Sequence, residues 1–350
     1  MKYHSMVNGP LHIKRGCQRV QSDSITNSKR KSKRTIQNTQ TENRNGSDTL
    51  KGKVLAICTQ ESEYARCLSE YILGRRELLF QVMVFPDLEK LRRFGEEHRI
   101  DLLLLDSTYA DMEKADTGQV FVLCDDPNCE KTDRCHPIYK YQSGEKIVAE
   151  ILSCCAEEAG SETILRIRKS DVEVIGVYSP IHRIGKTQYA LQLAKEFARK
   201  GNTLYLNLEE YAGRREEETG DGLAEVLYYL RQGCKNMGIR MEALVKHDEA
   251  VDYLTPMEMY QDLKSVTEEE WKQLLTEIAE KSIYETVVLD IGDAIQGTYG
   301  LLELCSCIYT PFVEEETAQM KMSQYRHNLT VMGLENIIDK TIFMEVRELP

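Results

Sequence analysis

Two blocks of the chain alternate short apolar runs with segments whose apolar residues recur at helical spacing. The first block begins near residue 53. It predicts strands at 54–57, 80–85, 101–106, 120–123 and 137–139, and helices at 62–73, 87–97 and 145–155. Asp87 is expected to cap the second helix. Because strands alternate with helices, this block predicts a parallel sheet covered on both faces.

The second block repeats the pattern after a charged segment. It predicts strands at 172–178, 203–208, 286–291 and 306–309, and helices at 187–199, 223–231 and 268–281. Thr267 and Glu270 form the sequence signature of a capping box at the start of the last helix. The alternating residues 342–350 favour a strand over an amphipathic helix, so any membrane contact is expected to be indirect.

These patterns predict an α/β protein with two doubly wound parallel-sheet domains. We expect a disordered basic tail at 1–51, a first domain at 52–157, a linker at 158–170 and a second domain at 171–350. The tail has too few apolar residues to offset the entropy of ordering. Its basic cluster 29–34 could touch anionic lipid or nucleic acid, although a solvated tail or an upstream start codon is the favoured explanation.

Charge and composition narrow the functional classes. The net charge is −12, yet residues 1–53 hold twelve basic and three acidic residues, so the remainder is strongly acidic. An acidic body argues against specific nucleic-acid binding, which needs a basic face. No apolar run approaches the roughly 20 residues of a membrane helix, and there is no apolar leader. We therefore expect a cytoplasmic protein whose eleven cysteines are thiols.

A phosphate-binding loop is predicted where the strand 172–178 meets the helix 187–199. Gly185-Lys186-Thr187 supplies the end of the pattern Gly, four residues, Gly-Lys-Ser/Thr, with Pro180 in place of the first glycine. Backbone N–H groups at a helix N-terminus still favour a phosphate there. The residues expected to line the cofactor are Arg183, Ile184, Gly185, Lys186, Thr187 and Gln188.

A matching carboxylate follows a later strand. The apolar run 286–289 ends in Asp290, the arrangement that a Mg²⁺-facing carboxylate beside a phosphate loop requires. Thr187 and Asp290 are the predicted metal residues, and Lys186, Glu209 and Asp290 the predicted catalytic ones. The predicted cofactors are ATP and Mg²⁺. A water-positioning or metal role for Glu209 remains a hypothesis.

The order of these motifs resembles the MinD/ParA class of P-loop ATPases. With a receiver-like domain of flavodoxin type in front, it is most similar to the TadZ/CpaE group, localisation ATPases of Flp (tight-adherence) pilus systems. The resemblance spans about residues 52–350, and the segments that carry it are 178–180, 206–211, 227–231, 290–293 and 309–311. It implies a homodimer, pilus or secretion machinery as partners, and a position at the cell pole or the inner face of the membrane through those partners.

Departures from the family pattern predict weak or absent hydrolysis. The family's signature lysine falls on Ile181, and the next two glycines fall on His182 and Arg183. The acidic pair expected after the next strand is Asn207-Leu208-Glu209, which keeps one acid. Loss of a cation that stabilises the transition state can cost about 10³-fold in rate. The alternatives are a ParA-like partitioning ATPase and a signalling protein regulated by phosphorylation.

The first domain resembles a response-regulator receiver that lacks its metal site. The phosphoacceptor position falls on Asp106 and the partner lysine on Lys140, but the acidic pair falls near Thr59-Gln60, with Glu61 the nearest acid. Without two carboxylates Mg²⁺ is poorly held. We favour a partner-docking or dimerising domain over phosphorylation. The cluster Cys124, Cys129, Cys135 and His136 lacks paired Cys-x-x-Cys spacing, so an ordinary loop is preferred to a zinc site.

Overall fold

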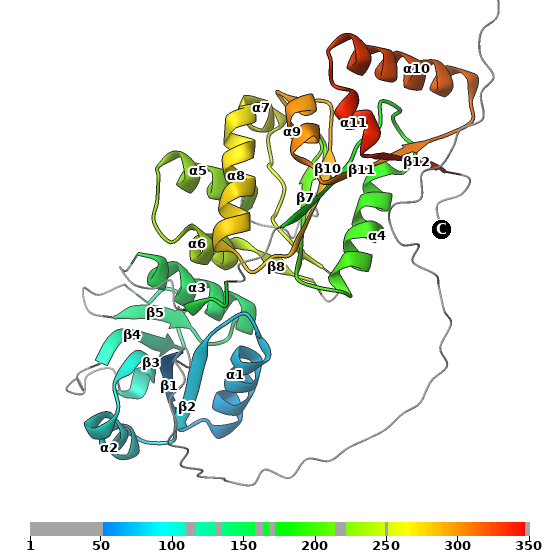
Figure 1. Ribbon diagram of the computed structural model, residues 1–350. Coiled ribbons are helices and arrows are strands. Elements are labelled where there is room, and N and C mark those ends of the chain that lie inside the picture. Colours follow the sequence, from blue (N-terminus) through cyan, green and yellow to red (C-terminus); the bar gives the residue numbers. More distant parts are fainter. Residues whose placement is uncertain are drawn as a thin grey trace, which may run out of the picture. The chain divides into compact units, whose positions relative to one another are not determined.

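Two sheets organise the part of the chain that the computed structural model describes, residues 52–109, 117–129, 135–157, 164–167, 172–213, 222–248 and 251–346 (Figure 1). All of these residues belong to one compact unit, 49–350. The first lobe is defined here as residues 52–157 and the second lobe as residues 172–346. The basic tail 1–51 with its cluster 29–34, most of the linker 158–170 and residues 347–350 lie outside the described residues.

The first sheet is parallel throughout, with strand order β2-β1-β3-β4-β5. Its strands are β1 (Lys53–Cys58), β2 (Phe80–Phe85), β3 (Ile100–Asp106), β4 (Thr117–Cys124) and β5 (His136–Tyr139). Helices α1 (Ser62–Gly74) and α3 (Gly144–Ala156) pack on one face, and α2 (Leu88–Glu97) packs on the other. Alternate residues of β1 and β3 enter the two apolar clusters. The predicted doubly wound parallel sheet is therefore confirmed for this lobe.

The second sheet has seven strands in the order β12-β11-β6-β10-β7-β9-β8. Its strands are β6 (Glu173–Val177), β7 (Thr203–Leu208), β8 (Lys246–His247), β9 (Asp252–Tyr253), β10 (Thr286–Ile291), β11 (Cys307–Phe312) and β12 (Thr341–Glu345). All pairings are parallel except that of β8 with β9. The fold class is confirmed, and the short antiparallel edge makes this sheet mixed.

Helices cover both faces of the second sheet. One face carries α4 (Lys186–Ala198), whose Ala190, Leu193 and Ala194 are buried against β6, β7 and β10. The other face carries α5 (Gly222–Arg231), α6 (Met237–Leu244), α8 (Glu268–Lys281), α9 (Thr298–Leu304) and α10 (Glu316–Val331). Shorter helices are η1 (Ser107–Tyr109), α7 (Tyr260–Ser265) and α11 (Glu335–Asp339). The predicted capping box is present at α8, where Thr267 and Glu270 bond reciprocally.

The C-terminal residues confirm the predicted strand. β12 pairs in parallel with β11 at the edge of the second sheet. Helix α10 precedes it, and its buried residues include Met322, Tyr325 and Leu329. None of the helices in the described part of the chain combines the length and the apolar character needed to cross a bilayer.

The one described part of the linker, residues 164–167, packs against the first lobe. Leu165 forms an antiparallel bridge with Leu78, the Leu79 N–H donates to the Ile164 carbonyl at 2.7 Å, and both linker side chains are buried. These residues therefore contribute to the core, which the charged flanks of the segment did not indicate.

A buried charged cluster links the loop before β2 to the β8–β9 edge. Arg75 forms ion pairs with Glu77 and, at 2.8 Å, with Glu242 on α6. His247 lies 3.5 Å from Glu242 and bonds through Nδ1 to Asp252 at 2.9 Å. Burial raises the pKa of Glu242 to about 7, against the opposing effect of His247 and Arg75. Burial lowers the pKa of His247, but the Asp252 bond outweighs it and the net shift is upward.

Candidate functional site

The loop between β6 and α4 has the backbone of a phosphate cradle. Gly185 is the N-cap of α4 and has a left-handed conformation, with φ 76° and ψ 25°. Arg183 is also left-handed, with φ 58°, although it has a Cβ. Such a conformation costs a non-glycine residue about 1 kcal/mol. The predicted opening of the helix at Lys186-Thr187 is confirmed, and the N–H groups of a first helical turn are donors of the kind that bind phosphate.

Ser179 fixes the start of this loop to the neighbouring strand. Its hydroxyl donates to the Pro311 carbonyl on β11 at 2.8 Å and accepts from the Ile181 N–H at 3.1 Å. Ile181 is buried in the core. Position 181, where the sequence comparison led us to look for a lysine, is therefore part of the packing.

Lys186 lies among three oxygen atoms at the carboxyl ends of β7 and β10. Its ammonium forms an ion pair with Glu209, donates to the Ile291 carbonyl, and lies 3.2 Å from Asp290 Oδ1. The predicted catalytic residues Lys186, Glu209 and Asp290 are thus brought together. Strand register explains this meeting, because β7 and β10 are parallel neighbours that pair Asn207 with Asp290.

Asp290 is fully buried at the end of β10. Its Oδ2 accepts a hydrogen bond from the Tyr205 hydroxyl at 3.3 Å. Among the described residues, its Oδ1 receives no hydrogen bond and forms an ion pair with Lys186. A buried carboxylate oxygen without a hydrogen bond is costly unless a cation or a metal-bound water serves it. This oxygen therefore fits the predicted role of orienting Mg²⁺ or its water.

Tyr205 was not predicted from the sequence. It lies on β7 two residues before Asn207 and therefore on the same face of the strand. Burial raises the pKa of Tyr205, and the charge of Asp290 adds to the effect. A tyrosine between two leucines of a strand was the available signal, but its partner is set by the register of β7 with β10.

Asn207 shapes the loop that carries Glu209. Its Oδ1 accepts from the Glu209 N–H at 3.0 Å and its Nδ2 donates to the Ala212 carbonyl at 3.4 Å. The side chain thus holds a turn. Burial raises the pKa of Glu209 although Lys186 opposes the shift. Glu209, the one acidic residue present where an acidic pair was expected, is therefore the residue that contacts Lys186.

The other predicted cofactor residues differ in how exposed they are. Arg183 and Gln188 are exposed, and Ile184 and Thr187 are half-buried. His182 forms an ion pair with Asp293 at 3.2 Å, and both side chains are largely exposed. Thr187 opens α4 directly after Lys186, so its hydroxyl is in the position from which phosphate-loop threonines hold Mg²⁺.

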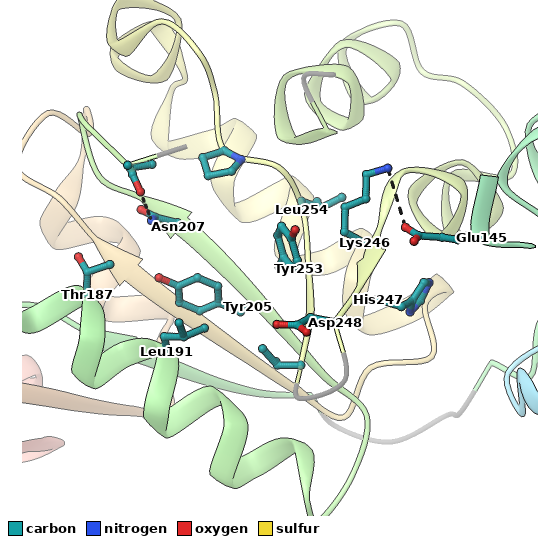
Figure 2. A pocket seen from close by; sticks show the side chains of 14 residues that line it. Glu145, Thr187, Leu191, Tyr205, Asn207, Lys246, His247, Asp248, Tyr253 and Leu254 are labelled. Atoms are coloured by element: carbon teal, nitrogen blue, oxygen red, sulfur yellow. Dashed lines mark hydrogen bonds and ion pairs between the residues drawn. The ribbon is translucent and has the colours of Figure 1, made fainter. Parts of the chain in front are cut away.

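A cavity of about 470 Å³ adjoins Thr187 on the α4 side of the sheet (Figure 2). Figure 2 shows Tyr205, Asn207 and Leu191 on one wall and Tyr253, His247 and Lys246 on the other. It is lined by Glu145, Thr187, Leu191, Tyr205, Asn207, Ala212, Gly213, Lys246, His247, Asp248, Val251, Tyr253, Leu254 and Pro256. The Tyr205 hydroxyl links this wall to Asp290.

The donor set at the loop fits a polyphosphate and its metal. The helix N-terminus and Lys186 supply positive charge, while the Thr187 hydroxyl and the buried Asp290 carboxylate supply oxygen ligands. Oxygen ligands of this kind suit Mg²⁺, which binds few protein groups and keeps several waters. Lys186 and the loop backbone would hold the phosphates, with Thr187 and Asp290 directed at the metal.

In the first lobe, the predicted phosphoacceptor position Asp106 is enclosed by neighbouring side chains. Asp106 accepts from the Thr59 hydroxyl at 2.8 Å, and from the Thr108 N–H at 3.0 Å and hydroxyl at 2.9 Å. Burial raises the pKa of Asp106, but these bonds outweigh it and the pKa falls below its usual value. Lys140 pairs with Asp125 and, at 2.7 Å, with Glu61. Glu61, the acid nearest to the expected pair of metal-binding carboxylates near Thr59-Gln60, is therefore paired with Lys140.

The cysteine-rich loop of the first lobe gives no metal centre among the residues described. No group of three or more His, Cys, Asp or Glu side chains there could hold an ion. Cys124 is buried, and burial raises the pKa of its thiol to about 12, with Cys129 adding to the shift.

No family model matches the chain, and no curated protein matches it. Solved structures with similarity include a ParA family ATPase from Chlorobium tepidum TLS, with 14% identity, a TM-score of 0.40, and coverage of 51% of this chain and 85% of that one. The MinC:MinD complex of Aquifex aeolicus has 14% identity, a TM-score of 0.37, and coverage of 50% and 68%. Cobyrinic acid a,c-diamide synthase from Mycobacterium smegmatis, with bound ATP analog and magnesium, has 15% identity, a TM-score of 0.37, and coverage of 49% and 72%. Similarity at this level leaves the family and the activity open.

Proposed function

We propose that the second lobe binds ATP with Mg²⁺ as a MinD/ParA-type nucleotide switch. The observation that carries the proposal is the meeting of Lys186, at the start of α4, with Asp290, at the end of β10. A phosphate-binding lysine and a metal-facing carboxylate at the same sheet edge are the two charged parts that such a site needs. The Thr187 position and the left-handed Gly185 complete it.

Slow turnover is part of the proposal. Ile181 is packed in the core where related loops carry a lysine that reaches across a dimer. Transition-state charge would then rely on Lys186, the loop N–H groups and Mg²⁺. Binding would be retained and hydrolysis would be weak, which suits a protein whose bound nucleotide controls assembly.

The experiment compares binding of ATP in the presence of Mg²⁺, by calorimetry on the full chain, for three proteins. Lys186→Ala removes the ammonium, and Lys195→Ala, in the last turn of the same helix, is the matched control. We expect the wild type and the control to bind alike and Lys186→Ala to bind at least tenfold more weakly, because a charge-assisted bond to phosphate is lost. Equal binding by all three proteins would refute the assigned site.

For the biological role, we propose a homodimeric localisation factor for a Flp-type pilus machine. The support is the resemblance in segments 178–180, 206–211 and 227–231, together with the receiver-like lobe in front. The first lobe would dock partners, since its Asp106 is enclosed by hydroxyl groups. A fluorescent fusion in the organism of origin tests this role. We expect the wild type to form polar foci and pili, and Lys186→Ala to form neither. Normal pili in a deletion strain would exclude it.

A further inference from the structure

The ammonium of Lys186 is surrounded by protein oxygens. It forms an ion pair with Glu209, donates to the Ile291 carbonyl, and lies 3.2 Å from Asp290 Oδ1, which accepts no hydrogen bond. The side chain is 12% exposed. A phosphate oxygen that approaches Lys186 therefore competes with these oxygens for the same ammonium.

The three oxygen groups differ in how easily a phosphate can displace them from Lys186. Asp290 is fully buried in β10, and the Ile291 carbonyl belongs to the backbone of the same strand. Glu209 lies just beyond the end of β7, and its side chain is 24% exposed. Among the described residues, its carboxylate has an ion pair with Lys186 and no other. Glu209 is therefore the acceptor that can be displaced with the least disturbance.

The loop after β7 is built to present this carboxylate. Asn207 accepts the Glu209 N–H and bonds to the Ala212 carbonyl, which fixes the turn between them. Gly292, after β10, lets the two loops approach closely, because a Cβ at that position would lie 2.8 Å from the Leu208 carbonyl oxygen and 3.1 Å from the Glu209 Cα. The side chain is thus held against Lys186 by backbone contacts on both strands.

We propose that Glu209 is an internal competitor of phosphate, whose carboxylate takes the ammonium of Lys186 and sets the affinity of the loop for polyphosphates. This inference rests on the proposed function. A carboxylate and a phosphate are interchangeable acceptors for an ammonium, and a carboxylate close to a triphosphate also repels it. Removing the charge of Glu209 therefore strengthens binding, the opposite of the effect at a residue that holds the ligand.

The test measures the affinity of the full chain for ATP and for inorganic pyrophosphate, both with EDTA, by calorimetry. In the absence of Mg²⁺, the measured affinity reports only the contacts between the protein and the ligand itself. We expect Glu209→Gln to bind both ligands about fivefold to tenfold more tightly than the wild type, since a neutral amide has no net charge to attract the ammonium or to repel the phosphates. Glu209→Ala is expected to change affinity in the same direction and guards against an effect peculiar to glutamine.

Glu210→Gln is the matched control, because it removes the same charge one residue away. The expected result is little change. Binding by Glu209→Gln that is unchanged or weaker than that of the wild type overturns the inference and leaves nucleotide binding intact. An equal gain in Glu210→Gln also overturns it, since the effect would then be one of general charge. If none of the four proteins binds either ligand in EDTA, the inference fails, and the proposed function fails as well only if the wild type also does not bind ATP in the presence of Mg²⁺.

Discussion

The buried carboxylate of Glu242 makes the stability of the second lobe depend on pH. Glu242 is 3% exposed and lies 2.8 Å from Arg75 and 3.5 Å from His247. Burial raises its pKa from 4.5 to about 7. One pKa unit is worth about 1.4 kcal/mol, so the shift corresponds to about 3 kcal/mol as an upper limit.

The direction of the pKa shift of Glu242 determines whether stability rises or falls with pH. A carboxyl whose pKa is raised in the folded state favours folding while it is protonated. That contribution is complete below pH 4.5 and is lost as the pH rises through about 7. The raised pKa of His247 acts in the same direction. We therefore expect the free energy of unfolding to fall between pH 5 and pH 8, with Glu242 responsible for up to about 3 kcal/mol of the fall.

Urea unfolding, monitored by tryptophan fluorescence, measures the contribution of Glu242 to the pH dependence of stability. Trp271 is the sole tryptophan of the sequence and is buried in α8 of the second lobe, so its emission reports this lobe. Glu242→Gln keeps the size of the side chain and an acceptor for Arg75, and we expect its stability to vary less with pH than that of the wild type. Glu269→Gln, at an exposed position of α8, is the control for net charge.

Two results would refute this reasoning. Parallel stability curves for the wild type and Glu242→Gln from pH 5 to pH 8 would mean that Glu242 does not titrate in this range. A variant that is less stable than the wild type by the same amount at every pH would mean that Glu242 is an ionised partner of Arg75, since loss of one member of a buried pair typically costs about 3–5 kcal/mol.

Three further predictions concern the two candidate sites. Arg183→Gly relieves a left-handed φ of 58° and should raise the free energy of unfolding by up to about 1 kcal/mol, measured by the Trp271 assay; a loss of stability would contradict it. Tyr205→Phe removes the bond to Asp290 and should weaken the Mg²⁺-dependent part of ATP affinity about fivefold to tenfold, with binding in EDTA unchanged; an unaltered Mg²⁺ titration would count against it. Incubation with a small phosphodonor and Mg²⁺ should leave Asp106 unmodified by intact mass, because Glu61 is held by Lys140, and a phosphoryl adduct would show the opposite.

Periodicity predicted most of the regular elements because their apolar faces are buried. The strands 203–208 and 286–291 and the helix 268–281 have the predicted bounds, and each is flanked by a clear polar or capping signal. Strands β8 and β9 were missed, since two residues each are too few to show a period of two. Helix α6 was missed as well, because its Met237, Gly238 and Glu242 give no amphipathic pattern.

Side-chain partners depended on register and on contacts far apart in the sequence. Lys186 and Asp290 were predicted to act at one site because an apolar strand that ends in Asp is the expected companion of a phosphate loop, and they lie 3.2 Å apart. Tyr205 could not be assigned to Asp290 without knowing that β7 pairs with β10. Nothing in the sequence links Arg75 to Glu242, 167 residues away, and a buried glutamate is not distinguishable there from an exposed one.

The central claim is that the loop at Lys186 holds nucleotide phosphates, and ATP binding with Mg²⁺ tests it most directly. Calorimetry of the wild type, Lys186→Ala and Lys195→Ala should give binding that is at least tenfold weaker only for Lys186→Ala. Identical binding by the three proteins, or no binding by the wild type and by Glu209→Gln alike, would contradict the account.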